Sequence, residues 1–126
     1  MKKVIYTPGA PAPIGPYSQA IDTGNTLYVS GQIAIDPTTG ELDNLTIEAE
    51  TKRVLQNLTA ILKQANYHFE DVVKCSIFLS SMEYFGIVNE LYATLFNEKT
   101  APARETVAVA GLPKGVSVEI SLIAQK

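Results

Sequence analysis

The chain has 126 residues, of which 46% are hydrophobic and 18% are charged. These are the proportions of an ordinary globular protein, and we expect a single domain over residues 1–126. The formal net charge is −3 and no basic cluster is longer than two residues, which argues against nucleic-acid binding. One histidine and one cysteine cannot build a usual structural zinc site or an internal disulfide, so we expect no metal.

The sequence also has no signal for a membrane or a cofactor. No apolar run is long enough to cross a membrane, and the segment before Pro8 is too short for the apolar core of a signal peptide. Together with the single cysteine, this predicts a cytoplasmic protein. There is no phosphate-binding glycine-rich loop and no dinucleotide fingerprint, and we expect no cofactor.

The first half of the chain predicts three strands and one long helix. Four of the seven prolines fall within residues 8–16, which predicts a stiff, irregular loop between the first two strands. Apolar residues then recur with a helical period after Thr46, whose hydroxyl is a good N-cap. The expected strands are 3–6, 17–22 and 26–33, and the expected helix is 46–65.

The second half predicts a strand at 71–79, a helix at 82–97 capped by Ser81, and two closing strands that we read as a hairpin around residues 111–115. The order is three strands, helix, strand, helix and two strands. It predicts an α+β domain, with one mixed sheet and two helices packed on one face.

Two charged residues of the closing strands stand out. Arg104 is one of only two arginines, and Glu119 lies between Val118 and Ile120, where a carboxylate is costly without a partner or a task. An arginine can bind a carboxylate ligand through two hydrogen bonds, and a half-buried glutamate can transfer a proton. The pair therefore predicts a small-molecule site, with a structural ion pair as the alternative.

A hairpin would bring these two residues together. If the strands pair about the middle of residues 112–113, Thr106 lies opposite Glu119. Arg104 then lies opposite Ser121, and its Cβ is about 7–8 Å from that of Glu119, on the same face.

Other residues that could belong to a functional site are explained by a structural role alone. His68 falls between a helical and a strand pattern, which predicts a surface loop. Cys75 lies in an apolar run, which predicts a buried, inert thiol. Tyr92 and Phe96 are expected in the core.

Five short motifs extend this reading beyond the single residues. They are Gly15-Pro16-Tyr17-Ser18-Gln19-Ala20, Ser30-Gly31-Gln32-Ile33, Asn89-Glu90-Leu91-Tyr92, Pro102-Ala103-Arg104 and Val118-Glu119-Ile120. In this order the chain resembles the Rid (YjgF) family, and within it the RidA branch. The resemblance covers nearly the whole sequence. It implies a chorismate-mutase-like fold and a homotrimer with one cleft between each pair of subunits.

The resemblance also implies an activity: hydrolysis of 2-imino acids, such as 2-iminobutanoate and 2-iminopropanoate, to 2-oxo acids and ammonia. These imines arise from pyridoxal-phosphate-dependent dehydratases, so the implied role is the control of metabolite damage. Arg104 matches the residue that binds the substrate carboxylate, and Glu119 matches the acid that handles water. The remaining residues implied to bind substrate are Tyr17, Ser30, Gly31, Asn89 and Thr106.

Each of these assignments has an alternative. Tyr17 would also serve to cover a sheet edge, Ser30 and Gly31 to end a strand with a glycine backbone, and Asn89 to lie on a helix surface. The position of Thr106 is often Cys or Ser in the family, so a thiol role is absent here while a backbone N–H role is retained.

Glu105 stands where the family usually has a small residue. By alternation along the strand it should point away from the face of Arg104.

Two other functions remain open in the sequence. A regulatory module that binds small carboxylates without turnover would use the same cleft and depend less on Glu119. RNA cleavage with inhibition of translation is the third reading, and the acidic charge argues against it.

Overall fold

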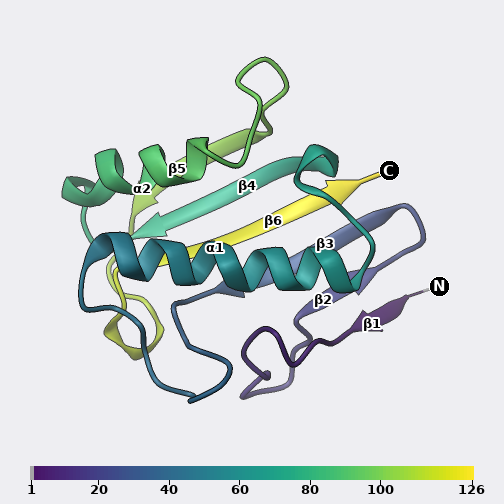
Figure 1. Cartoon of the computed structure of the whole chain (residues 1–126), viewed down its shortest axis with the longest axis horizontal. Helices are drawn as coiled ribbons and strands as arrows, with labels where there is room; N and C mark the ends of the chain where they lie inside the picture. Colours follow the sequence, from purple (N-terminus) through teal and green to yellow (C-terminus); the bar gives the residue numbers. More distant parts are fainter. Residues whose placement is uncertain (1) are drawn as a thin grey trace.

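The computed structural model describes residues 2–126. Figure 1 shows a sheet with two helices packed across it. The elements are β1 (Lys3–Ile5), β2 (Ala20–Asp22), β3 (Thr26–Gln32), α1 (Ile47–Gln64), β4 (Val72–Leu79), α2 (Phe85–Ala93), β5 (Ala103–Ala108) and β6 (Val118–Gln125), with 3₁₀ turns at Phe69–Asp71, Met82–Tyr84 and Pro113–Gly115.

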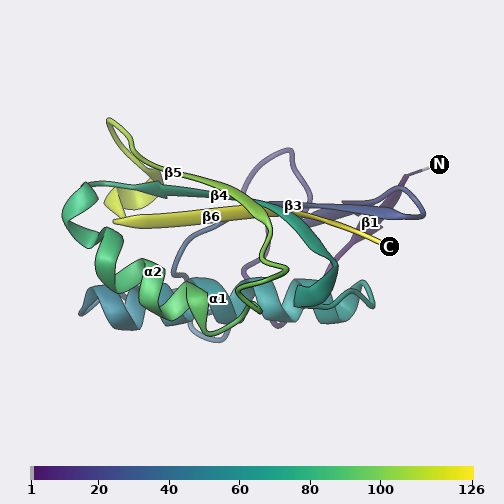
Figure 2. The same ribbon diagram turned by 90° about the horizontal axis from the view of Figure 1, so that it is seen from above.

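The six strands form one mixed sheet in the order β1-β2-β3-β6-β4-β5. All neighbouring strands are antiparallel except β4 and β5, which are parallel. Both helices lie on one side of the sheet, and the other side carries no helix within residues 2–126 (Figure 2). The predicted α+β architecture, with two helices on one face, is confirmed.

The long helix α1 forms where its pattern predicts. The Thr46 hydroxyl accepts a hydrogen bond from the Ala49 N–H at 3.0 Å, which satisfies one of the free donors at the helix start. Its apolar face, including Val54, Leu58 and Ile61, is fully buried.

The two closing strands do not pair with each other, so the expected hairpin is wrong. Strand β4 lies between β5 and β6. Arg104 is paired with Cys75, and Thr106 with Ile77; Glu119 faces Phe78 rather than Thr106.

The physical reason is the helix between β4 and β5. A strand, a helix and a second strand form a crossover unit, which places the two strands side by side and parallel. The glycines and proline at 111–115 resemble a hairpin turn, but the chain there crosses over β4 to reach its other edge.

The second helix is also shorter than predicted. Ser81 caps it through a hydrogen bond from the Glu83 N–H at 3.2 Å, as expected, but the first turn is 3₁₀ and α2 proper ends at Ala93. The Thr94 hydroxyl donates to the Leu91 carbonyl at 2.7 Å, which is how such residues compete with helix hydrogen bonds. Phe96 still packs against Tyr92, with ring centroids 4.7 Å apart.

The two faces of the sheet differ sharply. On the helix side, Cys75, Ile77, Ile120 and Leu122 belong to the buried core. On the open side, apolar and small polar side chains lie uncovered or half-covered. They include Val4, Ile21, Tyr28, Val73, Ser76, Phe78, Val107, Ser121 and Ile123.

Candidate functional site

The strand order separates the two charged residues that the sequence singled out. Arg104 shares a register row with Cys75 and Leu122, on the helix side of the sheet. Glu119 alternates with the buried Val118 and Ile120, so it lies on the open side. Since β4 also separates their strands, no small ligand can touch both side chains within one chain.

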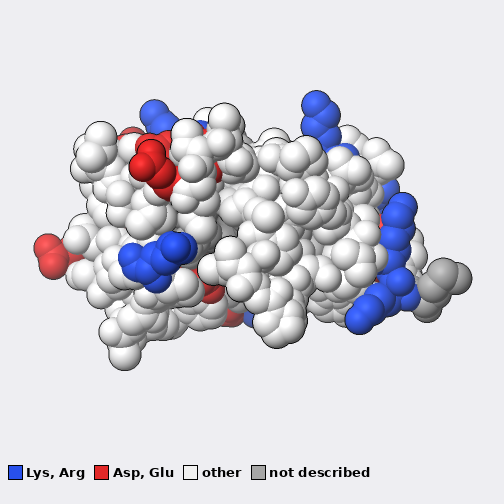
Figure 3. All heavy atoms as spheres, turned by 90° about the horizontal axis from the view of Figure 1, so that it is seen from below, with Lys and Arg blue, Asp and Glu red and all other residues white. Residues whose placement is uncertain are grey.

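Glu119 lies in a hollow at the end of β3 and the start of β6. The hollow has a volume of about 400 Å³ and is walled by the proline-rich loop, the segment after β3 and the turn before β6. Figure 3 views the molecule from the side of these loops, where much of the central surface carries no charged side chain. The lining residues are Pro11, Ala12, Ile14, Tyr17, Gln19, Ser30, Gly31, Gln32, Ile33, Ile35, Pro113, Lys114 and Glu119.

Glu119 lies directly against the backbone of Gly31. A Cβ added at Gly31 would lie 2.6 Å from the Oε2 atom of Glu119, so only glycine leaves room for the carboxylate. Gly31 also falls within the register shift between Val29 and Gln32, a type of bulge common beside active sites. Burial raises the pKa of the Glu119 carboxyl above its ordinary value of 4.5, which favours a role in proton transfer.

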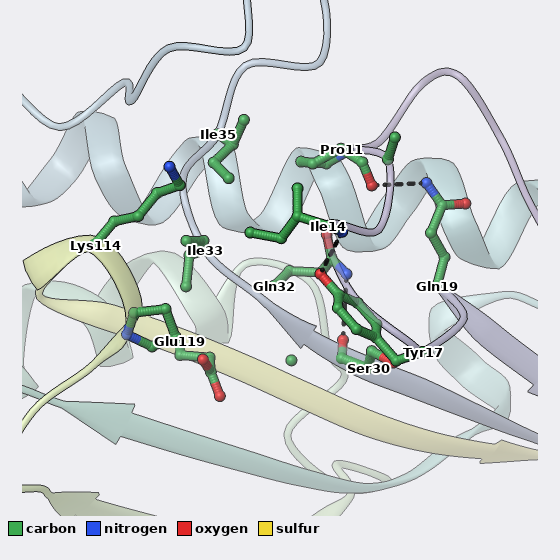
Figure 4. Close-up of a pocket in the computed structure, with 13 residues that line it drawn as sticks. Pro11, Ile14, Tyr17, Gln19, Ser30, Gln32, Ile33, Ile35, Lys114 and Glu119 are labelled. Carbon is green, nitrogen blue, oxygen red and sulfur yellow. Dashed lines mark hydrogen bonds between the residues drawn. The ribbon is translucent and has the colours of Figure 1, made fainter.

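Figure 4 shows Tyr17 and Ser30 on the side of the hollow opposite Lys114, whose side chain extends toward Ile35. The Ser30 hydroxyl donates to the Ser18 carbonyl at 2.6 Å, which fixes its oxygen in place. Half of the Tyr17 side chain is exposed. The sequence therefore identified four residues that the fold brings together here: Tyr17, Ser30, Gly31 and Glu119.

Two buried amide side chains support this hollow, and sequence reasoning assigned a role to neither. The Gln19 side chain is 1% exposed; it accepts from the Thr7 N–H at 2.7 Å and donates to the carbonyls of Thr7, Ala10 and Pro11. It thereby holds the proline-rich loop. Asn57 of α1 donates to the carbonyls of Ile33 and Ile35, and so holds the wall after β3.

Arg104 forms a second group of candidate residues, beside α2. Its Nη1 donates to the Asn89 Oδ1 at 2.7 Å, so Asn89 faces the strand rather than solvent. The guanidinium lies over the rings of Phe85 and Tyr92. Thr106, two residues along β5, has a buried hydroxyl without a hydrogen-bond partner in residues 2–126.

Glu105 points to the open side of the sheet, away from the face of Arg104, as alternation predicts. Its carboxylate accepts from Lys74 Nζ at 2.7 Å and from the Ser76 hydroxyl, and these contacts hold its pKa below the usual value. His68 is exposed and Cys75 is buried and free, as expected.

Within residues 2–126, no helix is both long and apolar enough to cross a membrane. The same residues contain no cluster of three or more His, Cys, Asp or Glu side chains that could hold a metal ion.

Known proteins match this chain over nearly its full length. The sequence model of the family described as Endoribonuclease L-PSP matches residues 7–126. A RutC family protein of Pyrococcus horikoshii is 51% identical, with 100% of this chain and 99% of that protein covered. The 2-iminobutanoate/2-iminopropanoate deaminase of Mus musculus is 48% identical, with 98% and 91% covered.

Solved structures agree with the fold. A putative endoribonuclease of Thermotoga maritima superposes with a TM-score of 0.96 at 53% identity and covers 100% of this chain and 98% of its own. TdcF of E. coli with bound serine superposes with a TM-score of 0.92 at 38% identity, with 98% of both chains covered. The chain therefore belongs to the Rid (YjgF) family, as the five sequence motifs indicated.

Proposed function

We propose that this protein hydrolyses reactive 2-imino acids to 2-oxo acids and ammonia, with 2-iminobutanoate and 2-iminopropanoate as substrates. The observation that carries the proposal is the half-buried Glu119, whose pKa is raised by burial in a hollow walled mostly by apolar residues. A carboxyl whose pKa is raised by burial suits a group that both accepts and returns a proton. The deaminase name of the mouse relative supports the same reaction.

Arg104 and Glu119 have the functional groups that hydrolysis of a 2-imino acid requires. Arg104, with one N–H engaged by Asn89, retains donors for two parallel hydrogen bonds to the substrate carboxylate. Glu119 accepts a proton from water as the water oxygen bonds to the imine carbon. It then returns that proton to the nitrogen, which gives a carbinolamine. In a second transfer Glu119 accepts the proton of the new hydroxyl and delivers it to the nitrogen, so the carbon–nitrogen bond breaks, ammonia leaves and the carbonyl of the 2-oxo acid forms. One such group contributes about 10²–10⁴-fold to the rate.

This mechanism requires a second copy of the chain, because Arg104 and Glu119 of one chain lie on opposite faces of the sheet. We place the site in a cleft between subunits of a homotrimer, with Arg104, Asn89 and Thr106 from one subunit. The neighbouring subunit contributes the residues around Glu119. The uncovered apolar side chains on the open face support such contacts, since exposed apolar patches mark interaction surfaces.

A coupled assay tests the activity. Threonine dehydratase generates 2-iminobutanoate, and this protein should accelerate release of 2-oxobutanoate and ammonia relative to buffer and to heat-inactivated protein. Arg104→Ala should remove the acceleration while the oligomer, measured by light scattering, stays unchanged. Equal rates with and without the wild-type protein at neutral pH would overturn the proposal.

Subunit complementation tests the shared cleft. Arg104→Ala and Glu119→Gln should each be nearly inactive alone. When the two variants are co-expressed, about one quarter of the clefts combine an intact Arg104 with an intact Glu119 from different chains, and activity should return to that level. If the co-expressed protein is as inactive as either variant while the wild type is active, the two-subunit site is wrong.

The bound serine in TdcF of E. coli favours one alternative, a module that binds small carboxylates without turning them over. In that case Glu119→Gln would bind 2-oxo acids normally, and the wild type would show no acceleration. RNA cleavage, which the family description suggests, is less well supported. The net charge is −3, and Lys114 is the one Lys or Arg among the residues that line the hollow.

A further inference from the structure

The guanidinium of Arg104 lies against two aromatic rings of α2. Its Cζ atom is 4.9 Å from the centre of the Tyr92 ring and 5.7 Å from that of Phe85. Both distances are within the range in which a cation is attracted to the electron-rich face of a ring. Asn89, on the same helix, binds Nη1 at 2.7 Å. Three side chains of α2 therefore contact this one group.

Tyr92 is the more firmly placed of the two rings. It is 6% exposed and packs against Phe96, whose ring lies 4.7 Å away and contacts Phe69 in turn. Its hydroxyl is buried and has no hydrogen-bond partner in residues 2–126. The hydroxyl has only the Cys75 thiol, a weak partner, beside it, and the ring itself provides the surface on which the guanidinium rests.

Without such a surface, an arginine on an exposed edge strand would sample many side-chain conformations. Every residue of β5 except Thr106 is exposed, so the strand itself restrains Arg104 little. The Tyr92 ring restricts where the guanidinium can lie, and the hydrogen bond to Asn89 restricts its rotation. The donors that remain free then have a fixed direction, which lowers the entropic cost of binding a planar carboxylate.

We propose that Tyr92 is a positioning residue that holds Arg104 ready to bind the substrate carboxylate, with Phe85 as a weaker second support. This inference rests on the proposed function, in which Arg104 binds that carboxylate. It predicts that the ring of Tyr92, and not its hydroxyl, sets the affinity for 2-oxo and 2-imino acids.

The experiment measures binding and turnover separately. Binding of 2-oxobutanoate is measured by calorimetry, and KM and kcat are measured in the dehydratase-coupled assay. Tyr92→Leu should weaken 2-oxobutanoate binding about 2- to 30-fold, the range that corresponds to a cation–ring contact. KM should rise by a similar factor and kcat should change less, because the carboxylate contact exists in both ground and transition states. Tyr92→Phe should bind as the wild type does.

Tyr67→Leu is the matched control. Tyr67 is also buried, and its ring lies 4.4 Å from the ammonium of Lys126. Its hydroxyl binds Asp22 of β2, which lies toward the opposite edge of the sheet from β5 and Arg104. This variant should lose stability and keep its affinity. If Tyr92→Leu fails to fold, Tyr92→Met replaces it, because methionine fills irregular space without a ring.

The outcomes are distinct. Unchanged binding in a folded Tyr92→Leu or Tyr92→Met protein overturns the inference, as does an equal loss of affinity in Tyr92→Phe. Failure of the wild type to bind 2-oxobutanoate also overturns it. If the wild type binds 2-oxobutanoate with the predicted dependence on Tyr92 but does not hydrolyse the imine, the proposed deaminase is wrong and the positioning role stands.

Discussion

Replacing Gly31 with alanine would put a methyl group into the space that the Glu119 side chain occupies. The added Cβ would lie 2.6 Å from Oε2, 2.8 Å from Cδ and 3.1 Å from Cγ of Glu119. Carbon and oxygen atoms that are not bonded do not approach so closely, because attraction between heavy atoms is optimal near about 3.5–4.0 Å. One of the two groups must move by several tenths of an ångström or more.

The group that moves is the Glu119 carboxylate, since it is the far end of a flexible side chain while Gly31 is fixed within β3. Gly31 has no positive φ, so alanine fits its backbone. The free energy of unfolding should therefore change by less than about 1 kcal/mol. Turnover should fall much further, by about 10²–10⁴-fold in kcat, because the displaced carboxylate no longer reaches the attacking water.

The measurements are kcat for imine hydrolysis and the free energy of unfolding in urea. Gly86→Ala is the matched control: Gly86 is exposed on α2, and an added Cβ there meets nothing within 4 Å. That variant should keep full activity and gain up to about 1 kcal/mol of stability from better helix propensity. A Gly31→Ala protein that is folded and as active as the wild type would show that the position of Glu119 does not govern the reaction.

Three further predictions concern charge and stability. Glu119→Gln should raise Tm at pH 7, because burial raises the folded pKa of Glu119 above its ordinary 4.5 and its ionised form therefore costs stability. The difference should vanish below about pH 4, where the side chain is protonated in both states, and a constant difference across pH would contradict the assignment. Glu50 is 2% exposed, and its Oε2 accepts the N–H groups of Ser117 at 2.8 Å and Val118 at 2.9 Å. Glu50→Ala should cost about 2–6 kcal/mol in urea unfolding by leaving both donors unpaired, and Glu50→Gln clearly less. Thr46→Ala should cost about 0.5–2 kcal/mol through loss of the helix cap, and Thr46→Ser should restore most of that stability.

Local signals in the sequence were sufficient for most of the fold. The cap at Thr46 and the helical period after it give α1, because a polar cap and an apolar stripe act over a few residues. The same holds for Ser81 and for the alternating strand β3. These elements form where propensity, pattern and capping agree.

The strand order required information that no local pattern contains. Residues 111–115 have the glycines and proline of a hairpin turn, yet β4 lies between β5 and β6. Both arrangements satisfy the same alternation of apolar residues. Pairing is decided by whether α2 can cover the sheet while it links two parallel strands, which depends on the assembled core.

The hydrogen-bond partners of buried polar residues were the second feature that the sequence could not predict. Glu50 lies in the first turn of α1, where an acid interacts favourably with the helix dipole, but its carboxylate also binds the backbone at the start of β6. Gln19 holds the proline-rich loop through contacts with residues eight or more positions away. A sequence pattern gives the residue type at such positions, whereas the partner is fixed only when distant segments meet.

Because β5 and β6 do not form a hairpin, the interpretation of Arg104 and Glu119 changes. In a hairpin, Arg104 and Glu119 would neutralise each other, and a structural ion pair would be a sufficient explanation. In the observed fold Arg104 lies at an exposed edge strand on one face, and Glu119 lies half-buried on the other. An edge strand that is exposed over nearly its whole length is a liability unless something covers it. A second subunit that covers this edge and brings its own Glu119 hollow to Arg104 would remove the liability and complete the site at once. The separation of the two residues within one chain is therefore the strongest structural reason to expect that assembly and catalysis depend on the same contacts.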